Sequence, residues 1–335
     1  MWSPSACWDS PGGDHVRFAF TDEQLAMRDA VRAFLDKECP PKVVRDAWTN
    51  DTGRSGLWSR LGELGVLGVL AAEAHGGFGG YYLDLVLLLE ETGRAALPEP
   101  VVEHAAVAMP LVDEARAEAA AAGAVTITVA PPSGLVLYAD TSDLVLLGDR
   151  FVEPGTLQLR HHESVDGSRR LFAIPSPPTS IQPATTDRAA LGIAAQLIGL
   201  ADRMLTMTVE YAKERRQFGV PIGSFQAVKH HLADVALALE FSRPLVYRAA
   251  WSIARGDADR SVHVAMAKAR ASEAALRAGR VALQVHGAIG YTTEYDLHLW
   301  MKRAWALAAS WGDASWHDAR VGRAILDTDR PPEEQ

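Results

Sequence analysis

Cysteine is scarce in this sequence, because 335 residues contain only Cys7 and Cys39. Two cysteines cannot build the disulfide framework of a small secreted protein, and they favour a reducing compartment. The N-terminus lacks a basic segment followed by an apolar run, so we expect no signal peptide. The apolar stretches noted along the chain, such as Gly65 to Ala72, are far shorter than the roughly 20 residues that cross a bilayer. We therefore expect a cytoplasmic protein with no membrane partner.

An excess of basic residues is also missing. Lysine and arginine number 33 against 42 acidic residues, which gives a net charge of −9. Nucleic-acid binding needs a basic surface, so this balance argues against a nucleic-acid partner. The composition is 48% hydrophobic and 22% charged, which is ordinary for a globular protein with ample core material. A chain of 335 residues predicts two or three domains.

Several motifs of common enzyme classes are absent. The glycine-rich stretch "HGGFGG", residues 75–80, follows no predicted strand and is expected to be a turn, and no P-loop is present. No glutamate of the predicted C-terminal helices has a histidine three residues later, which excludes a di-iron bundle and leaves no metal site. His230 and His231 are adjacent on a predicted helix and point in different directions, so we expect a surface position for both. The sequence also lacks the G-x-S-x-G elbow of a serine hydrolase.

The first third of the chain is predicted to be helical. Thr21 and Gln24 form a capping box at the start of the first helical pattern. Further helical patterns cover 57–69, 82–96 and parts of 99–122. From Gly123 the pattern changes to short β-branched runs broken by Gly, Pro and Asp, which predicts an antiparallel sheet or small barrel.

Four long helical patterns joined by short turns come next, as in an up-and-down four-helix bundle. They cover 188–214, 225–255, 259–286 and 297–326. Strands and helices do not alternate, so a doubly wound fold is excluded. The sequence predicts an α+β multidomain protein with an irregular N-terminus (1–17), an N-terminal α domain (18–123), a reduced antiparallel β domain (124–186), a C-terminal four-helix bundle (187–328) and a tail (329–335).

Two stretches of the predicted bundle concentrate unusual residues. "KERRQFGVPIGSFQAVKHHLADVA", residues 213–236, places Arg215 and Arg216 at a helix end. Cations suit a helix C-terminus, and they also suit a bound anion, so both interpretations stay open from the residues alone. "QVHGAIGYTTEY", residues 284–295, contains Gly287 and Gly290, which can end a helix and permit close backbone approach.

These two stretches, in this order, resemble the acyl-CoA dehydrogenase family. "ERRQFGVPIGSFQAVKHHLAD" resembles its R-x-x-F-G…Q…K-L-A-D segment, and "QVHGAIGYTTEY" resembles its Q-x-x-G-G-x-G-Y segment. "FTDEQLAMRDAVRAFLDKECPP" and "LGELGVLGVLAAEAHGGFGG" resemble its first helix and the next helix and loop. The resemblance covers about residues 18–326 and is weak only in the β region.

The resemblance implies FAD-dependent α,β-desaturation of an acyl-CoA thioester. In the family a glutamate removes the α-proton while the β-hydrogen leaves as a hydride to the flavin. The weakly acidic α-C–H needs a positioned base, and the enolate needs hydrogen-bond donors. The resemblance assigns FAD binding across a subunit interface to Arg215, Gln217 and Phe218, joined by Gln284 and Gly287.

Three departures from the family pattern concern this site. A count from Glu294–Tyr295 puts Ser310-Trp311-Gly312 where the family has Tyr-Glu-Gly, so Trp311 takes the position of the catalytic base. The earlier bundle helix that carries the base in some members offers only Asp257 nearby. The β region lacks the T-E-P-x-x-G-S-D and W-I-T-N stretches that surround the flavin in typical members.

Three hypotheses explain these departures. The first is a base-deficient subunit that donates its FAD-binding residues to a homologous partner in a heterotetramer. Such a chain resembles the smaller subunit of the heteromeric acyl-CoA dehydrogenases of actinobacterial steroid side-chain degradation. A steroid side-chain CoA ester is then one candidate substrate. The second is an active homo-oligomer with an atypical base, such as Asp257 or Glu240. The third is a non-enzymatic scaffold subunit that binds no FAD.

Overall fold

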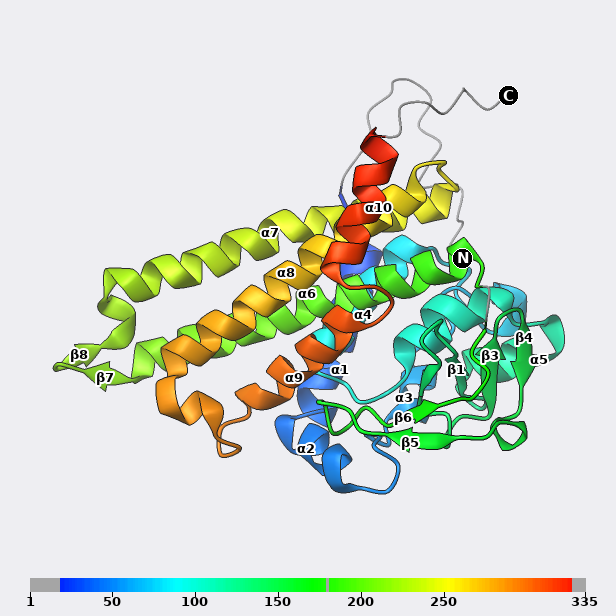
Figure 1. Ribbon diagram of the computed structural model, residues 1–335, viewed down its shortest axis with the longest axis horizontal. Coiled ribbons are helices and arrows are strands. Elements are labelled where there is room, and N and C mark those ends of the chain that lie inside the picture. Colours follow the sequence, from blue (N-terminus) through cyan, green and yellow to red (C-terminus); the bar gives the residue numbers. More distant parts are fainter. Residues whose placement is uncertain (1–18, 179–180, 327–335) are drawn as a thin grey trace.

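The computed structural model describes residues 19–178 and 181–326, and Figure 1 shows helices at both ends of the chain with small sheets between them. The predicted irregular N-terminus, the tail at 329–335 and Cys7 lie outside the described residues. This architecture confirms the predicted fold class, and Cys39 is a buried free thiol. The division into domains stays a prediction.

The N-terminal region is a set of helices in which the predicted capping box is confirmed. Thr21 Oγ1 accepts from the Gln24 N–H at 3.2 Å, and Gln24 Oε1 accepts from the Thr21 N–H at 2.9 Å. The helix expected over 57–69 already ends at Glu63, because Gly65 has φ +79°, which a right-handed helix cannot contain. The elements are α1 Asp22–Glu38, α2 Pro41–Thr49, α3 Trp58–Glu63, α4 Tyr82–Arg94, the π-helix η3 Val102–Ala108 and α5 Glu114–Ala121, with 3₁₀ turns η2 Glu73–His75 and η4 Met109–Leu111.

The β region forms two three-stranded sheets. One has the order β1 Ile127–Val129, β3 Leu144–Leu147, β4 Arg150–Val152, and the other the order β2 Leu135–Leu137, β6 Leu171–Ala173, β5 Arg160–His162. Strand β1 pairs with β3 in parallel, with Ile127 opposite Leu144, so the prediction of a purely antiparallel sheet was wrong for this pair. A parallel pair needs a crossover between its strands, and here β2 lies in that crossover but pairs in the second sheet.

The C-terminal region contains long helices, as predicted, but the fourth pattern is two helices. The elements are α6 Pro183–Glu214, α7 Gln226–Arg255, α8 Arg260–His286, the 3₁₀ turn η7 Gly287–Tyr291, α9 Leu297–Ala309 and α10 Ala314–Leu326. The single helix expected over 297–326 was wrong because Trp311 and Gly312 have φ angles of 54° and 93°. The Asp313 side chain then accepts from the Trp316 N–H at 2.8 Å and caps the next helix.

Helix α6 runs through the centre of the molecule and is buried on all sides from Ala189 to Ala201. One 18-residue window of this helix is long and apolar enough to cross a membrane, which the sequence-based expectation overlooked, and 78% of that window is buried inside the fold. Such burial is typical of a core helix. Close packing against α4 depends on glycine, because a Cβ on Gly93 would lie 2.1 Å from the Gln196 carbonyl oxygen.

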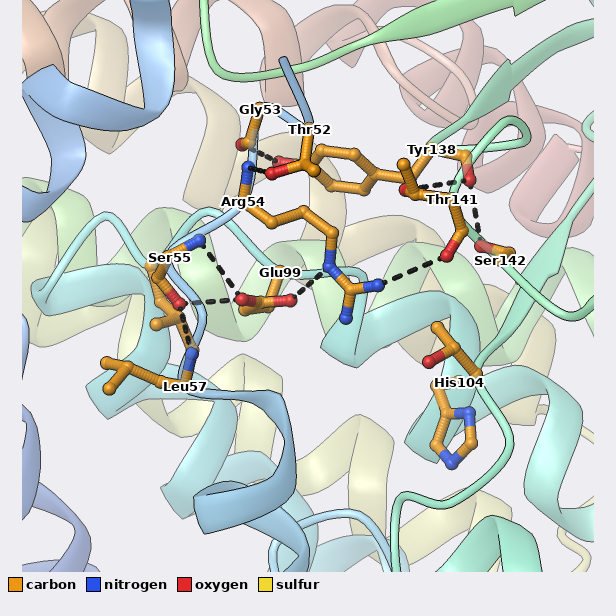
Figure 2. A network of polar contacts seen from close by, with 12 residues as sticks. Thr52, Gly53, Arg54, Ser55, Leu57, Glu99, His104, Tyr138, Thr141 and Ser142 are labelled. Carbon is orange, nitrogen blue, oxygen red and sulfur yellow. Dashed lines mark hydrogen bonds and ion pairs between the residues drawn. The ribbon is translucent and has the colours of Figure 1, made fainter. Parts of the chain in front are cut away.

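Buried ionic networks join the β region to the helices. Arg303 on α9 pairs with Asp166 and donates to Ser168 Oγ at 2.7 Å. Figure 2 shows a second network, in which the Glu99 carboxylate accepts from Arg54 Nε at 2.6 Å and from Ser55 Oγ at 2.6 Å. Because these carboxylates are almost fully buried, removing either cationic partner would leave a costly unpaired charge. Arg54 Nη1 also donates to the Thr141 carbonyl of the β region at 3.4 Å, so both networks link the β region to the helices.

Candidate functional site

The stretch that begins at Lys213 forms a short hairpin between α6 and α7, at one end of the helical region (Figure 1). Its strands, β7 Arg216–Gln217 and β8 Val220–Pro221, pair antiparallel. The two turn residues, Phe218 and Gly219, have φ angles of 53° and 83°. Positive φ at both positions is the pattern of a type I′ turn, which matches the twist of a hairpin.

Phe218 occupies this turn at a conformational cost. The left-handed conformation disfavours an aromatic residue by about 1–2 kcal/mol. Its ring is 93% exposed, so burial within the chain does not offset that cost. Its aromatic neighbour is Phe225, whose ring centroid lies 6.2 Å away. A strained and exposed aromatic side chain is typical of a residue that acts in binding.

The hairpin end is cationic although the chain as a whole is acidic. Residues 213–231 contain four lysines and arginines against one glutamate, a net charge of +3. Within 19–178 and 181–326, Arg215 forms no ion pair, and its side chain is exposed. Its backbone is fixed, because the Arg215 N–H donates to Tyr211 O and the Ile222 N–H donates to Arg215 O, both at 2.8 Å. An unpaired guanidinium on a fixed backbone is suited to a phosphate group.

The second predicted motif lies at the same end of the helical region. Gln284 is exposed on the last turn of α8, and Gly287 ends that helix at φ 64° and ψ −138°, a conformation available essentially to glycine alone. His286, which directly precedes Gly287, stacks on Tyr211 of α6 with ring centroids 4.3 Å apart. The structure therefore brings the ends of α6 and α8, which carry the two motifs, into direct contact.

Trp311 belongs to a different site, a cleft between the β region and the C-terminal helices. The cleft has a volume of about 550 Å³, within the range of small-molecule pockets. The turn at Ser310, Trp311 and Gly312 forms one wall. Other walls come from η3, β1, β2 and β6, and from α6, α9 and α10; they include Glu103, Val129, Leu135, Leu137, Arg169, Leu171, Thr186, Ala306 and Trp316.

Two buried side chains hold the Trp311 turn. The Lys268 ammonium donates to the carbonyl oxygens of Ala308 and Gly312, both at 3.0 Å. His317 Nε2 donates to the Trp311 carbonyl at 3.1 Å. Burial lowers the pKa of Lys268 to about 7, and burial, with the Lys268 charge as a smaller cause, lowers the pKa of His317 to about 4. The turn is therefore a fixed part of the fold.

The cleft contains a buried carboxylate that sequence reasoning missed. Glu103 is 6% exposed and lines the cleft together with Arg169, which is 66 positions away in sequence. Burial raises the pKa of Glu103, and the nearby Arg169 charge opposes that rise. The π-helical turn that presents Glu103 has no distinctive sequence signal, so only the folded chain shows this juxtaposition.

The two carboxylates considered as atypical bases lie outside this cleft. Glu240 is exposed on α7 and lies 3.6 Å from Arg243. Asp257 accepts from Ser252 Oγ at 2.9 Å in the turn between α7 and α8. Neither residue lines the cleft, so neither shares a pocket with Trp311.

The two sites differ in how well they fit FAD. The cleft presents two carboxylates, Glu103 and Glu163, against the single cation Arg169, a charge balance that disfavours a pyrophosphate. At the hairpin end, Arg215 offers unpaired donors, and Phe218 offers an exposed ring for stacking. The chemistry of the hairpin end therefore fits a flavin dinucleotide, and the flavin would supply the hydride acceptor.

Comparison with known proteins agrees with this geometry. Residues 21–128 match the acyl-CoA dehydrogenase N-terminal domain, and residues 181–326 match its C-terminal domain. The sequence is 34% identical to acyl-CoA dehydrogenase IpdE2 of Mycolicibacterium smegmatis over 294 residues, which cover 85% of this chain and 93% of that protein.

Solved structures share the fold. A Tcur3481–Tcur3483 steroid ACAD variant superposes with a TM-score of 0.81 at 26% identity, covering 91% of this chain and 98% of that one. The ChsE4–ChsE5 complex from Mycobacterium tuberculosis gives a TM-score of 0.83 at 23% identity, covering 94% of this chain and all of the matched one.

The chain belongs to the acyl-CoA dehydrogenase family. It is an oxidoreductase of the class that acts on the CH–CH bond of acyl-CoA thioesters, and its homologues are FAD-binding flavoproteins.

Proposed function

We propose that this chain is a base-deficient subunit of a heteromeric acyl-CoA dehydrogenase, and that it contributes residues to FAD held mainly by a homologous partner. The observation that carries the proposal is Trp311, which lines the cleft at the position where the family pattern has its glutamate. An indole N–H is only a donor, so this side chain cannot accept the α-proton. The partner would supply the base.

The FAD-binding role is proposed for Arg215, Gln217 and Phe218, joined by Gln284 and Gly287. Arg215 would hold the pyrophosphate, and Phe218 would stack on a ring. The support is physical: the guanidinium is unpaired within the described residues, the ring is exposed, and the hairpin fixes the backbone of both residues.

An apolar surface on α7 supports association with a partner. Leu237 and Phe241 are 56% and 76% exposed and line a shallow groove of about 330 Å³ between α7 and α8. Clustered exposed apolar side chains often mark a surface that contacts another protein.

The substrate is proposed to be an acyl-CoA thioester, with a steroid-derived acyl group suggested by the relative described as a steroid ACAD. A cytoplasmic location belongs to the same proposal.

Flavin retention by Arg215→Ala tests the proposed role. Loss of a charged hydrogen bond to pyrophosphate costs about 1.5–3 kcal/mol, so the Kd of the co-expressed complex for FAD should rise about 10- to 150-fold. Arg255→Ala is the matched control, because Arg255 is an exposed arginine at the opposite end of α7. An unchanged Kd for Arg215→Ala would favour a scaffold that binds no FAD.

An active homo-oligomer with its own base is the second candidate, and Glu103 is the observation in its favour. This carboxylate lies in the Trp311 cleft, and burial raises its pKa. If the lone chain turns over an acyl-CoA and Glu103→Gln abolishes turnover while Glu240→Gln does not, this candidate replaces the first.

A further inference from the structure

Three aromatic rings, those of Tyr211, His286 and Tyr295, form a cluster where α6 and α8 meet. His286 stacks on Tyr211 with ring centroids 4.3 Å apart and an angle of 23° between the rings. It also lies against Tyr295, with centroids 4.8 Å apart. His286 is only 4% exposed, whereas both tyrosines are half-buried. The imidazole is therefore the buried member of this aromatic cluster.

The aromatic cluster is connected to both motifs of the proposed flavin site. On α6, the carbonyl oxygen of Tyr211 accepts from the Arg215 N–H at 2.8 Å. On α8, His286 directly precedes Gly287. A Cβ on Gly290 would lie 3.1 Å from the Cβ of His286, so the turn that follows α8 packs closely against this residue. A shift of His286 would therefore move the two motifs relative to each other.

Hydrogen bonding defines the protonation state of His286. A carbonyl oxygen can only accept, so the 2.8 Å contact of Nδ1 with Ala282 O places the proton of the neutral ring on Nδ1. Nε2 is buried and has no hydrogen-bond partner within 19–178 and 181–326. A proton on Nε2 would be buried without an acceptor, which disfavours the charged ring. Burial accordingly lowers the pKa of His286, and the bond to Ala282 O opposes that fall.

The groups that face His286 do not compensate for a charge on its ring. Its direct neighbours are phenols, and burial raises the pKa of Tyr295, with the charge of Glu210 as a smaller cause. Arg203 on α6 and Asp296 also act on Tyr295, with opposite effects on its pKa. The face of a phenol attracts a cation, but the lowered pKa of His286 shows that burial outweighs this attraction.

We propose that His286 is a positioning residue of the flavin site, and that its neutral ring fixes the end of α8 relative to Arg215. This inference rests on the FAD role proposed above and adds a residue that acts through its neighbours. A group whose pKa is lowered in the folded chain stabilises the fold above its unfolded pKa. The contribution of His286 is therefore complete above pH 6.5 and is lost as the pH falls through its lowered pKa.

Amide exchange of the purified full-length chain tests the aromatic cluster without flavin. Once released, His286 regains an ordinary pKa near 6.5, so a change from pH 7.5 to pH 5 favours the opened state up to about 30-fold. After correction for intrinsic exchange rates, the protection factors of residues 284–291 should fall at least fivefold. His286→Phe keeps a stacked ring that cannot titrate, so its protection factors should change less than twofold. An equal fall in both proteins would overturn the proposal.

The flavin affinity of the co-expressed complex connects the aromatic cluster to the site. At pH 7.5, His286→Ala should raise the Kd for FAD at least tenfold, whereas His286→Phe should stay within twofold of the natural chain because it restores the ring. His162→Phe is the control, because His162 is exposed on β5, and it should change neither Kd nor exchange. An unchanged Kd for His286→Ala would overturn the positioning role.

A second variant covers the case in which His286→Ala does not fold. Tyr211→Leu removes the other ring of the stack and should also raise the Kd for FAD at least tenfold, so an unchanged Kd would contradict the proposal. The outcomes separate this proposal from the one on which it rests. If Arg215→Ala weakens FAD binding and His286→Ala does not, the FAD role holds and the positioning role fails. If Arg215→Ala leaves the Kd unchanged, the FAD role fails, and with it the positioning role.

Discussion

Replacing Phe218 with asparagine should stabilise the hairpin while weakening flavin retention. Asparagine tolerates the left-handed conformation that costs phenylalanine about 1–2 kcal/mol, and Asn-Gly is the favoured type I′ pair. The lost edge contact with Phe225, with ring centroids 6.2 Å apart, offsets about 0.5 kcal/mol of this gain. The 93% exposure of the ring leaves little burial to lose, so the net gain is about 0.5–1 kcal/mol.

Hydrogen exchange measures this gain locally. The Ile222 amide closes the hairpin onto Arg215 O, so its exchange should slow about two- to fivefold in Phe218→Asn. Phe225→Ala is the control, because Phe225 has φ −74°, so the substitution removes the same ring contact but relieves no strain and adds no helix cap. The co-expressed complex of Phe218→Asn should at the same time release FAD more readily. Faster exchange, or full flavin retention, would refute the argument that strain is tolerated here for binding.

The remaining predictions concern stability. His104 Nδ1 accepts from the Ile127 N–H, and burial lowers the pKa of His104 to about 4. The contribution of neutral His104 to the free energy of unfolding is therefore complete above pH 6.5, and about 3 kcal/mol of it is lost as the pH falls towards 4. In urea unfolding, the stability of His104→Gln should depend less on pH over this range, and an identical slope would contradict the prediction. Lys268→Met should speed amide exchange at 308–313, because it removes two hydrogen bonds to that turn; unchanged exchange would show that the turn needs no such support. Gly93→Ala should lower the free energy of unfolding by about 1–3 kcal/mol or more, because its Cβ would lie 2.1 Å from Gln196 O; an unchanged urea midpoint would disprove this clash.

Local signals in the sequence predicted much of the fold. The capping box at Thr21 and Gln24 is local chemistry, and so is the end of α8 before Gly287. The break at Trp311–Gly312 also had a local signal, a glycine followed by an aspartate that caps the next helix, but the strong helical periodicity on both sides concealed it.

Non-local pairings could not be predicted in the same way. Strand β1 pairs in parallel with β3 after a crossover, and no local sequence pattern specifies which strand β1 will pair with. The placement of Glu103 and Arg169 in the same cleft depends on how the β region docks against η3. The sequence did place Arg215 and Gln284 in two separate motifs, and the contact of Tyr211 with His286 shows why these motifs lie at one end of the helical region.

The central claim is tested most directly by the molar mass and flavin content of the purified chain, alone and co-expressed with a homologous acyl-CoA dehydrogenase. The account predicts that the lone chain retains no flavin and has no dehydrogenase activity, and that the complex is a heterotetramer with about one FAD per heterodimer. A lone homo-oligomer that holds about one FAD per chain and desaturates an acyl-CoA would contradict it.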